Sequence, residues 1–89
     1  MSKMRAKVRV AAVLPWQDDK GTVSQERLMF HGVAKSSAYP ADGSDEDNTF
    51  AKFSPSVAFD MMVANPALIG KFAVGDTFYV DFVPVPAKG

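Results

Sequence analysis

An alternating stretch near the end of the chain constrains its fold most. Phe78, Val80 and Phe82 alternate with Tyr79, Asp81 and Val83, and Pro84 follows. Because successive side chains of a β-strand point to opposite faces, this order places three large apolar side chains on one face. The stretch therefore predicts a final, half-buried strand that docks on a core.

The segment before this strand carries turn signals. Asn65-Pro66 precedes a short apolar run that Gly70 can end, and Gly75-Asp76 is typical of a turn. We expect one short helical turn over residues 67–69, directly before the last strand.

A first strand is predicted from Met4 to Leu14. Apolar and basic residues alternate to Val10, with Arg5, Lys7 and Arg9 on one face. The alternation is lost after Ala11, which predicts either a bulge or a strand end that is covered on both faces. Pro15 is expected to end the strand.

Two further strands are predicted at residues 23–34 and 56–64, and a short one at 50–53. The first of these follows the polar connector 17–21, so it should form an antiparallel hairpin with the N-terminal strand. Within it, Gly32 indicates a bulge or a close backbone approach.

These elements predict an all-β fold: a small antiparallel barrel or a two-layer sandwich, with OB-like and SH3-like topologies among those compatible. Residues 1–89 are expected to form a single β domain. Residues 35–49 form a long polar loop within it, and residues 84–89 form a Pro-rich tail.

Composition narrows the classes of function. The 89 residues include no cysteine, and ten basic residues balance ten acidic ones. The zero net charge disfavours a protein whose main task is to neutralise phosphates. No apolar run approaches a signal peptide or a membrane span, so we expect synthesis in the cytosol and no membrane partner.

No set of residues indicates catalysis, a cofactor or a metal. His31 is the only histidine, and Ser24 lies too far from it along the same strand for their side chains to meet. The acidic run Asp42, Asp45, Glu46 and Asp47 lacks the ligand spacing of an EF-hand, which favours a solvated loop over a calcium site. We expect a protein that is not an enzyme.

Two binding surfaces are predicted instead. Met62, Tyr79 and Val83 point outward and suggest an apolar surface for a protein partner, unless the chain's own loops cover that face. The polar contacts around such a surface would come from Tyr39, Asp45, Glu46 and Asp47. The alternative is a groove for single-stranded nucleic acid, formed by Arg5, Lys7, Arg9 and Trp16.

Three segments carry a resemblance to small proteins of tailed phages. They are the Met4–Val10 start, the YPADGSDEDNTFAKFSPS stretch at 39–56, and the ending that begins NPALIGKF. The resemblance implies a virion accessory or capsid-decorating protein, or a phage factor that binds a host protein. It implies no functional residues.

Together these features predict a phage-type protein-binding module, located in the host cytoplasm or the virion. A chain this short without disulfides is also expected to form homo-oligomers. A further alternative is an inhibitor of a host defence enzyme, in which the acidic 42–47 loop imitates nucleic acid.

Overall fold

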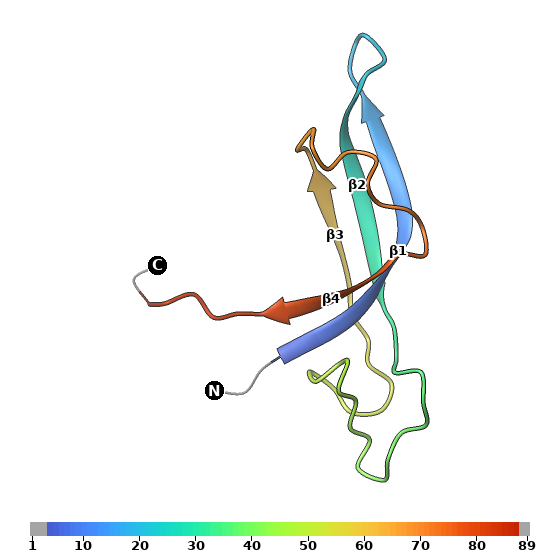
Figure 1. The fold of residues 1–89 in the computed structure, drawn as a ribbon, viewed down its shortest axis with the longest axis vertical. Helices are drawn as coiled ribbons and strands as arrows, with labels where there is room; N and C mark the ends of the chain where they lie inside the picture. Colours follow the sequence, from blue (N-terminus) through green and yellow to red (C-terminus); the bar gives the residue numbers. More distant parts are fainter. Residues whose placement is uncertain (1–3, 88–89) are drawn as a thin grey trace.

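A computed structural model describes residues 4–87 of the chain. In this range it contains four strands: β1 (Met4–Gln17), β2 (Val23–Gly32), β3 (Ala58–Val63) and β4 (Thr77–Phe82). They form one antiparallel sheet in the order β3-β2-β1-β4 (Figure 1). The predicted all-β antiparallel fold is confirmed, and the sheet is single and open.

A bulge bends β1 between two halves. Val10 lies opposite Phe30, but the next pair of the ladder is Ala12 with Met29, so Ala11 is the extra residue. The half before the bulge pairs with β4, and the half after it pairs with β2 alone. Figure 1 shows the resulting change of direction along β1. Of the two alternatives that the sequence left open at Ala11, the bulge is correct.

One face of the sheet, here called the core face, carries the buried apolar side chains. The segment between β3 and β4 passes over it (Figure 1), and Ile69 and Phe72 of this segment pack against the core. The Gly70 N–H donates to Glu26 Oε1 at 3.0 Å, and the Val10 N–H donates to Asp76 O at 2.8 Å. The buried apolar residues that form the core are Ala6, Val8, Val10, Leu28, Phe30 and Val63.

The polar loop completes the edge of β1 where β2 has ended. The Lys7 N–H donates to Asn48 Oδ1 at 2.8 Å, and Lys7 O accepts the Val33 N–H at 2.8 Å. Arg5 exchanges similar bonds with Thr49, whose hydroxyl accepts the Arg5 N–H at 2.8 Å. Residues 48–49 thus substitute for strand residues, Asn48 through its side chain and Thr49 through its side chain and its backbone N–H.

Gly32 shows the predicted close approach. A Cβ at this position would stand 2.9 Å from a methyl of Val57, and the Gly32 N–H donates to Val57 O at 2.8 Å. The chain that leads into β3 therefore comes closer to β2 than a side chain would permit.

Three expectations about the elements were wrong: the helical turn at 67–69, the strand at 50–53, and the end of the first strand at Pro15. No helix occurs within residues 4–87: the expected helical turn is a simple turn in which the N–H groups of Leu68 and Ile69 both donate to Asn65 O. Residues 50–53 form no strand, since Ala51 and Phe53 bond within the loop, to Asn48 O and Gly43 O.

Pro15 does not end β1. It lies inside the strand, opposite Glu26. The Gly32 bond to Val57 shows that even-numbered β2 residues direct their backbone groups to β3. Pro15 therefore occupies a non-hydrogen-bonded pair, where a backbone N–H would face the open edge, and such a position tolerates proline.

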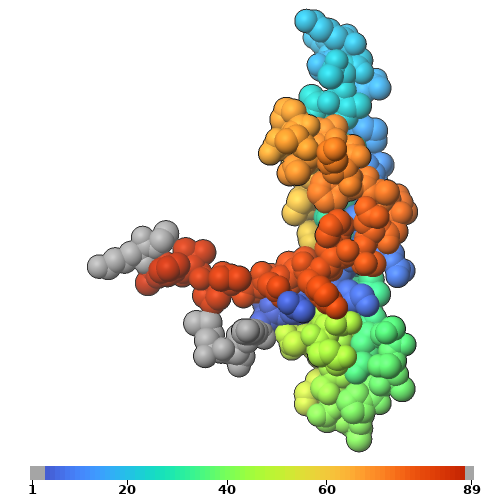
Figure 2. Space-filling view, viewed as in Figure 1, coloured from blue at the N-terminus to red at the C-terminus, as the bar shows by residue number. Residues whose placement is uncertain are grey.

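The molecule is thin and extended. Its principal extents are 55 × 37 × 16 Å and its radius of gyration is 16.2 Å, whereas a compact chain of this length has a radius of about 12 Å. Part of the difference is an arm, defined as Met4–Ala6 paired with Val80–Phe82 and continued by residues 83–87. Figure 2 shows the arm projecting from the body of the sheet. Residues 88 and 89 of the predicted tail lie outside the described residues.

Candidate functional site: the open face of the sheet

The face of the sheet opposite the core, here called the open face, carries a patch of exposed side chains on three neighbouring strands. Leu14 of β1 lies opposite Arg27 of β2, which lies opposite Met62 of β3. Trp16 follows two residues after Leu14 and therefore points to the same face. We call Leu14, Trp16, Arg27 and Met62 the distal patch.

The apolar members of the distal patch are largely accessible. Leu14 is 45% exposed, Trp16 61% and Met62 46%. The segment between β3 and β4 packs on the other side of the sheet, against the core. An accessible Trp beside Leu and Met on a flat sheet gives a large contact area at low cost in side-chain entropy.

Arg27 of the distal patch forms an ion pair with Asp60 of β3, and this pair fixes the position of the guanidinium. Arg27 Nε donates to Asp60 Oδ2 at 2.7 Å, and Nη2 donates to the same oxygen. Both side chains are about half exposed, so the pair itself contributes little to the free energy of folding. Its role in a binding surface would be to hold the Arg27 guanidinium beside Asp60 of β3.

The structure separates the three residues predicted to form one apolar surface. Met62 belongs to the distal patch, but Tyr79 lies on β4, at the opposite edge of the sheet, and Val83 follows it in the arm. Val83 is 79% exposed. Any contact that uses all three would have to extend across the whole width of the sheet.

Tyr79 makes contacts with the rest of its own chain. Its hydroxyl donates to Asp47 Oδ1 at 2.9 Å, and the guanidinium of Arg5 lies 4.3 Å from its ring centre. The hydrogen bond to Asp47 is the main reason that the pKa of Tyr79 lies above its ordinary value. The ring thus links β4 to the polar loop.

The acidic residues of the loop are directed toward donors of the same chain. Asp45 is buried and accepts the N–H groups of Lys35 and Asp47, at 3.1 and 2.9 Å. The Glu46 carboxylate lies 3.1 Å from Lys35 Nζ. Within residues 4–87, no group of three His, Asp or Glu is arranged to hold a metal ion.

Tyr39 is half-buried in the loop and packs against Phe53, with the ring centres 5.7 Å apart. Its hydroxyl is buried and makes no hydrogen bond with the residues described here. Tyr39 therefore contributes to the inner packing of the loop.

Two of the three cations predicted for nucleic-acid binding are paired with carboxylates. Arg5 Nε lies 2.6 Å from Asp81 Oδ1, which is the main reason that the pKa of Arg5 is raised. Lys7 Nζ lies 3.5 Å from Asp47 Oδ2. Arg9 is exposed, and Trp16 lies beyond the bulge on the distal half of β1. A phosphate backbone would have to compete with these two carboxylates.

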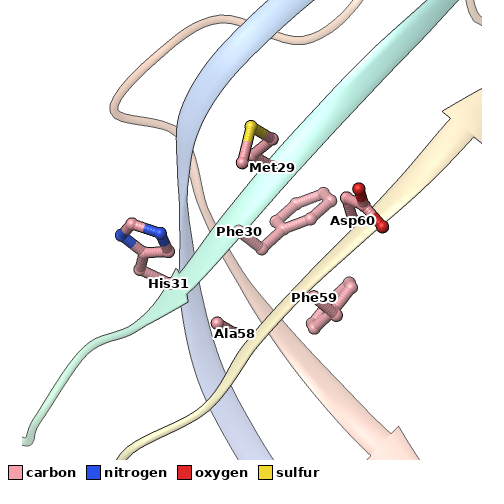
Figure 3. Close-up of a pocket in the computed structure, with 6 residues that line it drawn as sticks. All are labelled: Met29, Phe30, His31, Ala58, Phe59 and Asp60. Carbon is pink, nitrogen blue, oxygen red and sulfur yellow. The ribbon is translucent and has the colours of Figure 1, made fainter.

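A shallow hollow lies between β2 and β3 beside His31. It is lined by Met29, Phe30, His31, Ala58, Phe59 and Asp60. Figure 3 shows the His31 ring pointing away from Phe30 and Phe59, whose rings stack with their centres 4.7 Å apart. Of the two ionisable side chains at this hollow, Asp60 is bonded to Arg27. The arrangement brings no acid and base together.

Sequence reasoning missed Leu14 and Arg27 as parts of a site. Leu14 ends an apolar run in which no alternation indicates a face, and an extra residue at Ala11 reverses the alternation before it. The position of Arg27 depends on the register between β1, β2 and β3, which only the paired strands reveal.

No helix within residues 4–87 is long and apolar enough to cross a membrane. Comparisons of the chain with protein-family models, with curated proteins and with solved structures find no match.

Proposed function

We propose that the chain is a protein-binding module and not an enzyme, and that the distal patch is its docking surface. The observation that carries this proposal is the direct register of Leu14, Arg27 and Met62, with Trp16 beside them, all accessible on one face. Trp, Met and Arg are the residue types enriched at the centres of protein interfaces.

The shape of the molecule supports a partner that is itself large. The molecule is 16 Å thick in its shortest direction, and no residue of the distal patch lines the hollow beside His31. An exposed patch outside a hollow fits another folded protein better than a small molecule, which requires a concave site. Because the net charge of the chain is zero, it is not repelled at long range by a partner of positive or negative net charge.

We infer that this partner is a capsid, to which the chain attaches as an accessory or decorating subunit of a tailed phage. The resemblance at residues 4–10, 39–56 and 65–84 is the basis for choosing a capsid over a host protein. The intramolecular pairing of Arg5, Lys7 and the loop carboxylates disfavours both alternatives, the nucleic-acid groove and the nucleic-acid mimic.

Mass spectrometry of particles purified from the phage that encodes this sequence tests the capsid assignment. The chain should be present at a fixed ratio to the major capsid protein and should persist through density-gradient purification. Its absence from intact particles would overturn the capsid form of the proposal.

A reconstitution experiment tests the docking surface separately. Purified chain is added to particles that lack it, and bound chain is measured after sedimentation. Met62→Glu places a charge in the patch and should abolish binding, whereas Val74→Glu changes a residue that is 66% exposed, outside the patch, and should bind like the original chain. Equal binding by both variants would remove the patch from the proposal.

A further inference from the structure

We propose that two copies of this chain associate through the open edge of β4, forming a continuous eight-stranded sheet about a two-fold axis at Tyr79. This inference concerns self-association and goes beyond the docking function of the distal patch, which lies on the other half of the sheet. Four observations lead to it: the exposed area, the apolar arm, the backbone groups of β4, and the order of its side chains.

The single chain exposes more surface than a folded chain of its mass should. Its accessible area is 6451 Å², whereas a compact 9.6 kDa protein exposes about 5,100 Å². The excess of about 1,300 Å² exceeds the roughly 800 Å² per partner of a standard interface. A second copy therefore has ample area to bury.

The arm carries exposed apolar side chains. Phe82 of β4 lies opposite Met4 of β1, and Val83 follows Phe82. Met4 is 42% exposed, Phe82 50% and Val83 79%. Figure 2 shows that the arm extends away from the body of the sheet, so the other residues that the structure describes leave its outer part uncovered. These apolar side chains lie at the sheet edge formed by β4, where a further strand could pair.

The backbone of Tyr79 points to the open edge. Lys7, its partner in the ladder, directs its N–H to Asn48 and its C=O to Val33, on the other side of β1. Tyr79 therefore belongs to a non-hydrogen-bonded pair with β1, and its own N–H and C=O point away from the sheet. A strand with such groups exposed is a template for another strand.

The order of side chains along β4 suits pairing with an antiparallel copy of itself. With Tyr79 opposite Tyr79 of the second copy, Phe78 faces Val80 and Thr77 faces Asp81 of that copy. No two like charges stand opposite one another. The apolar residues of the two strands would then form one continuous row on the core face. The Arg5–Asp81 pair would remain on the open face.

A pair of variants at one position tests the backbone contact. Tyr79→Val and Tyr79→Pro both lose the bond to Asp47, but only the proline also removes the outward N–H. Sedimentation equilibrium should show dimers of the original chain and of Tyr79→Val in the micromolar range. Dimerisation of Tyr79→Pro should be about tenfold weaker or more, because the two central hydrogen bonds are lost.

A cross-link tests the axis and does not depend on how the proline variant folds. The chain has no cysteine, and residues that form a hydrogen-bonded antiparallel pair are about 5.5 Å apart at Cα, within disulfide range. Under mild oxidation, Tyr79→Cys should form a disulfide-linked dimer, while Ala58→Cys on the other sheet edge should not. A chain that is monomeric at all concentrations, equal association of the two Tyr79 variants, or cross-linking through Ala58→Cys would overturn the proposal.

Discussion

The side chain of Asn48 replaces a strand residue next to Lys7. Its Oδ1 accepts the Lys7 N–H at 2.8 Å, while its Nδ2 donates to Val33 O at 2.7 Å and to Asp45 Oδ2 at 3.1 Å. Asn48 is fully buried. A single amide group therefore joins β1, the end of β2 and the polar loop. This relationship explains why a loop composed of Ser, Asp, Gly and Asn has a defined position in the fold.

Replacement of Asn48 by Ala should destabilise the fold strongly. The Lys7 N–H and the Val33 carbonyl would lose their partner in a buried site, which costs about 2–4 kcal/mol of unfolding free energy. Urea unfolding measured by circular dichroism gives this value. Asn65→Ala is the matched control: its exposed side chain caps only the Ala67 N–H, and its loss should cost about 0.5–1 kcal/mol. Equal losses would contradict the role assigned to Asn48.

Stability should fall in acid through Asp45. Burial alone would raise the pKa of this carboxyl, but hydrogen bonds from the Asn48 side chain and from backbone N–H groups outweigh it, so the pKa lies below 3.8. The unfolded chain then binds a proton at higher pH than the folded chain does. The contribution of Asp45 is present above about pH 4 and is lost as the pH falls through the lowered folded value.

Asp45→Asn tests this dependence. The difference in unfolding free energy between the original chain and the variant should be largest at neutral pH and should shrink as the pH falls below about 4. Denaturant titrations at a series of pH values provide the measurement. A difference that stays constant over this range would show that Asp45 does not titrate in the way its hydrogen bonds imply.

Two glycines with the same backbone conformation should respond differently to Ala. Gly21 and Gly43 have φ angles of 79° and 76°, which cost an Ala residue about 1 kcal/mol. A Cβ at Gly21 would meet open space, whereas a Cβ at Gly43 would overlap the ring of Phe53. Gly21→Ala should therefore cost about 1 kcal/mol and Gly43→Ala about 2–3 kcal/mol, because Phe53 must move. Thermal melting of both variants compares them, and equal shifts would contradict the Phe53 contact.

Trp16→Ala should separate stability from binding. Trp16 is 61% exposed, so its removal should change the unfolding free energy by less than about 0.5 kcal/mol. Binding to particles should weaken at least tenfold if Trp16 anchors the distal patch, since aromatic anchors typically account for about 2 kcal/mol or more. Leu28→Ala, in the core, should show the opposite pattern, with a large loss of stability. A Trp16→Ala variant that binds normally would place the binding surface elsewhere.

The predictions that succeeded depended on local order along the chain. Alternation in residues 4–10 and 77–82 predicted which side chains share a face, and the ladder of β1 with β4 has the predicted facing. The break in alternation at Ala11 and the Gly at position 32 each indicated a backbone feature that the structure contains. Such features are readable because a strand's side chains and its special residues obey rules that involve only close neighbours.

What the sequence alone determined is the position of the four strands along the chain, the residues that share a face in 4–10 and 77–82, and the irregular course of residues 35–49. What only the tertiary structure decided is the sheet order, the burial of Asn48 and Asp45, and the distribution of Met62 and Tyr79 to opposite edges. The physical reason is that pairing partners and buried polar contacts join residues distant in the chain. One extra residue at Ala11 is enough to reverse which side of β1 every later side chain occupies.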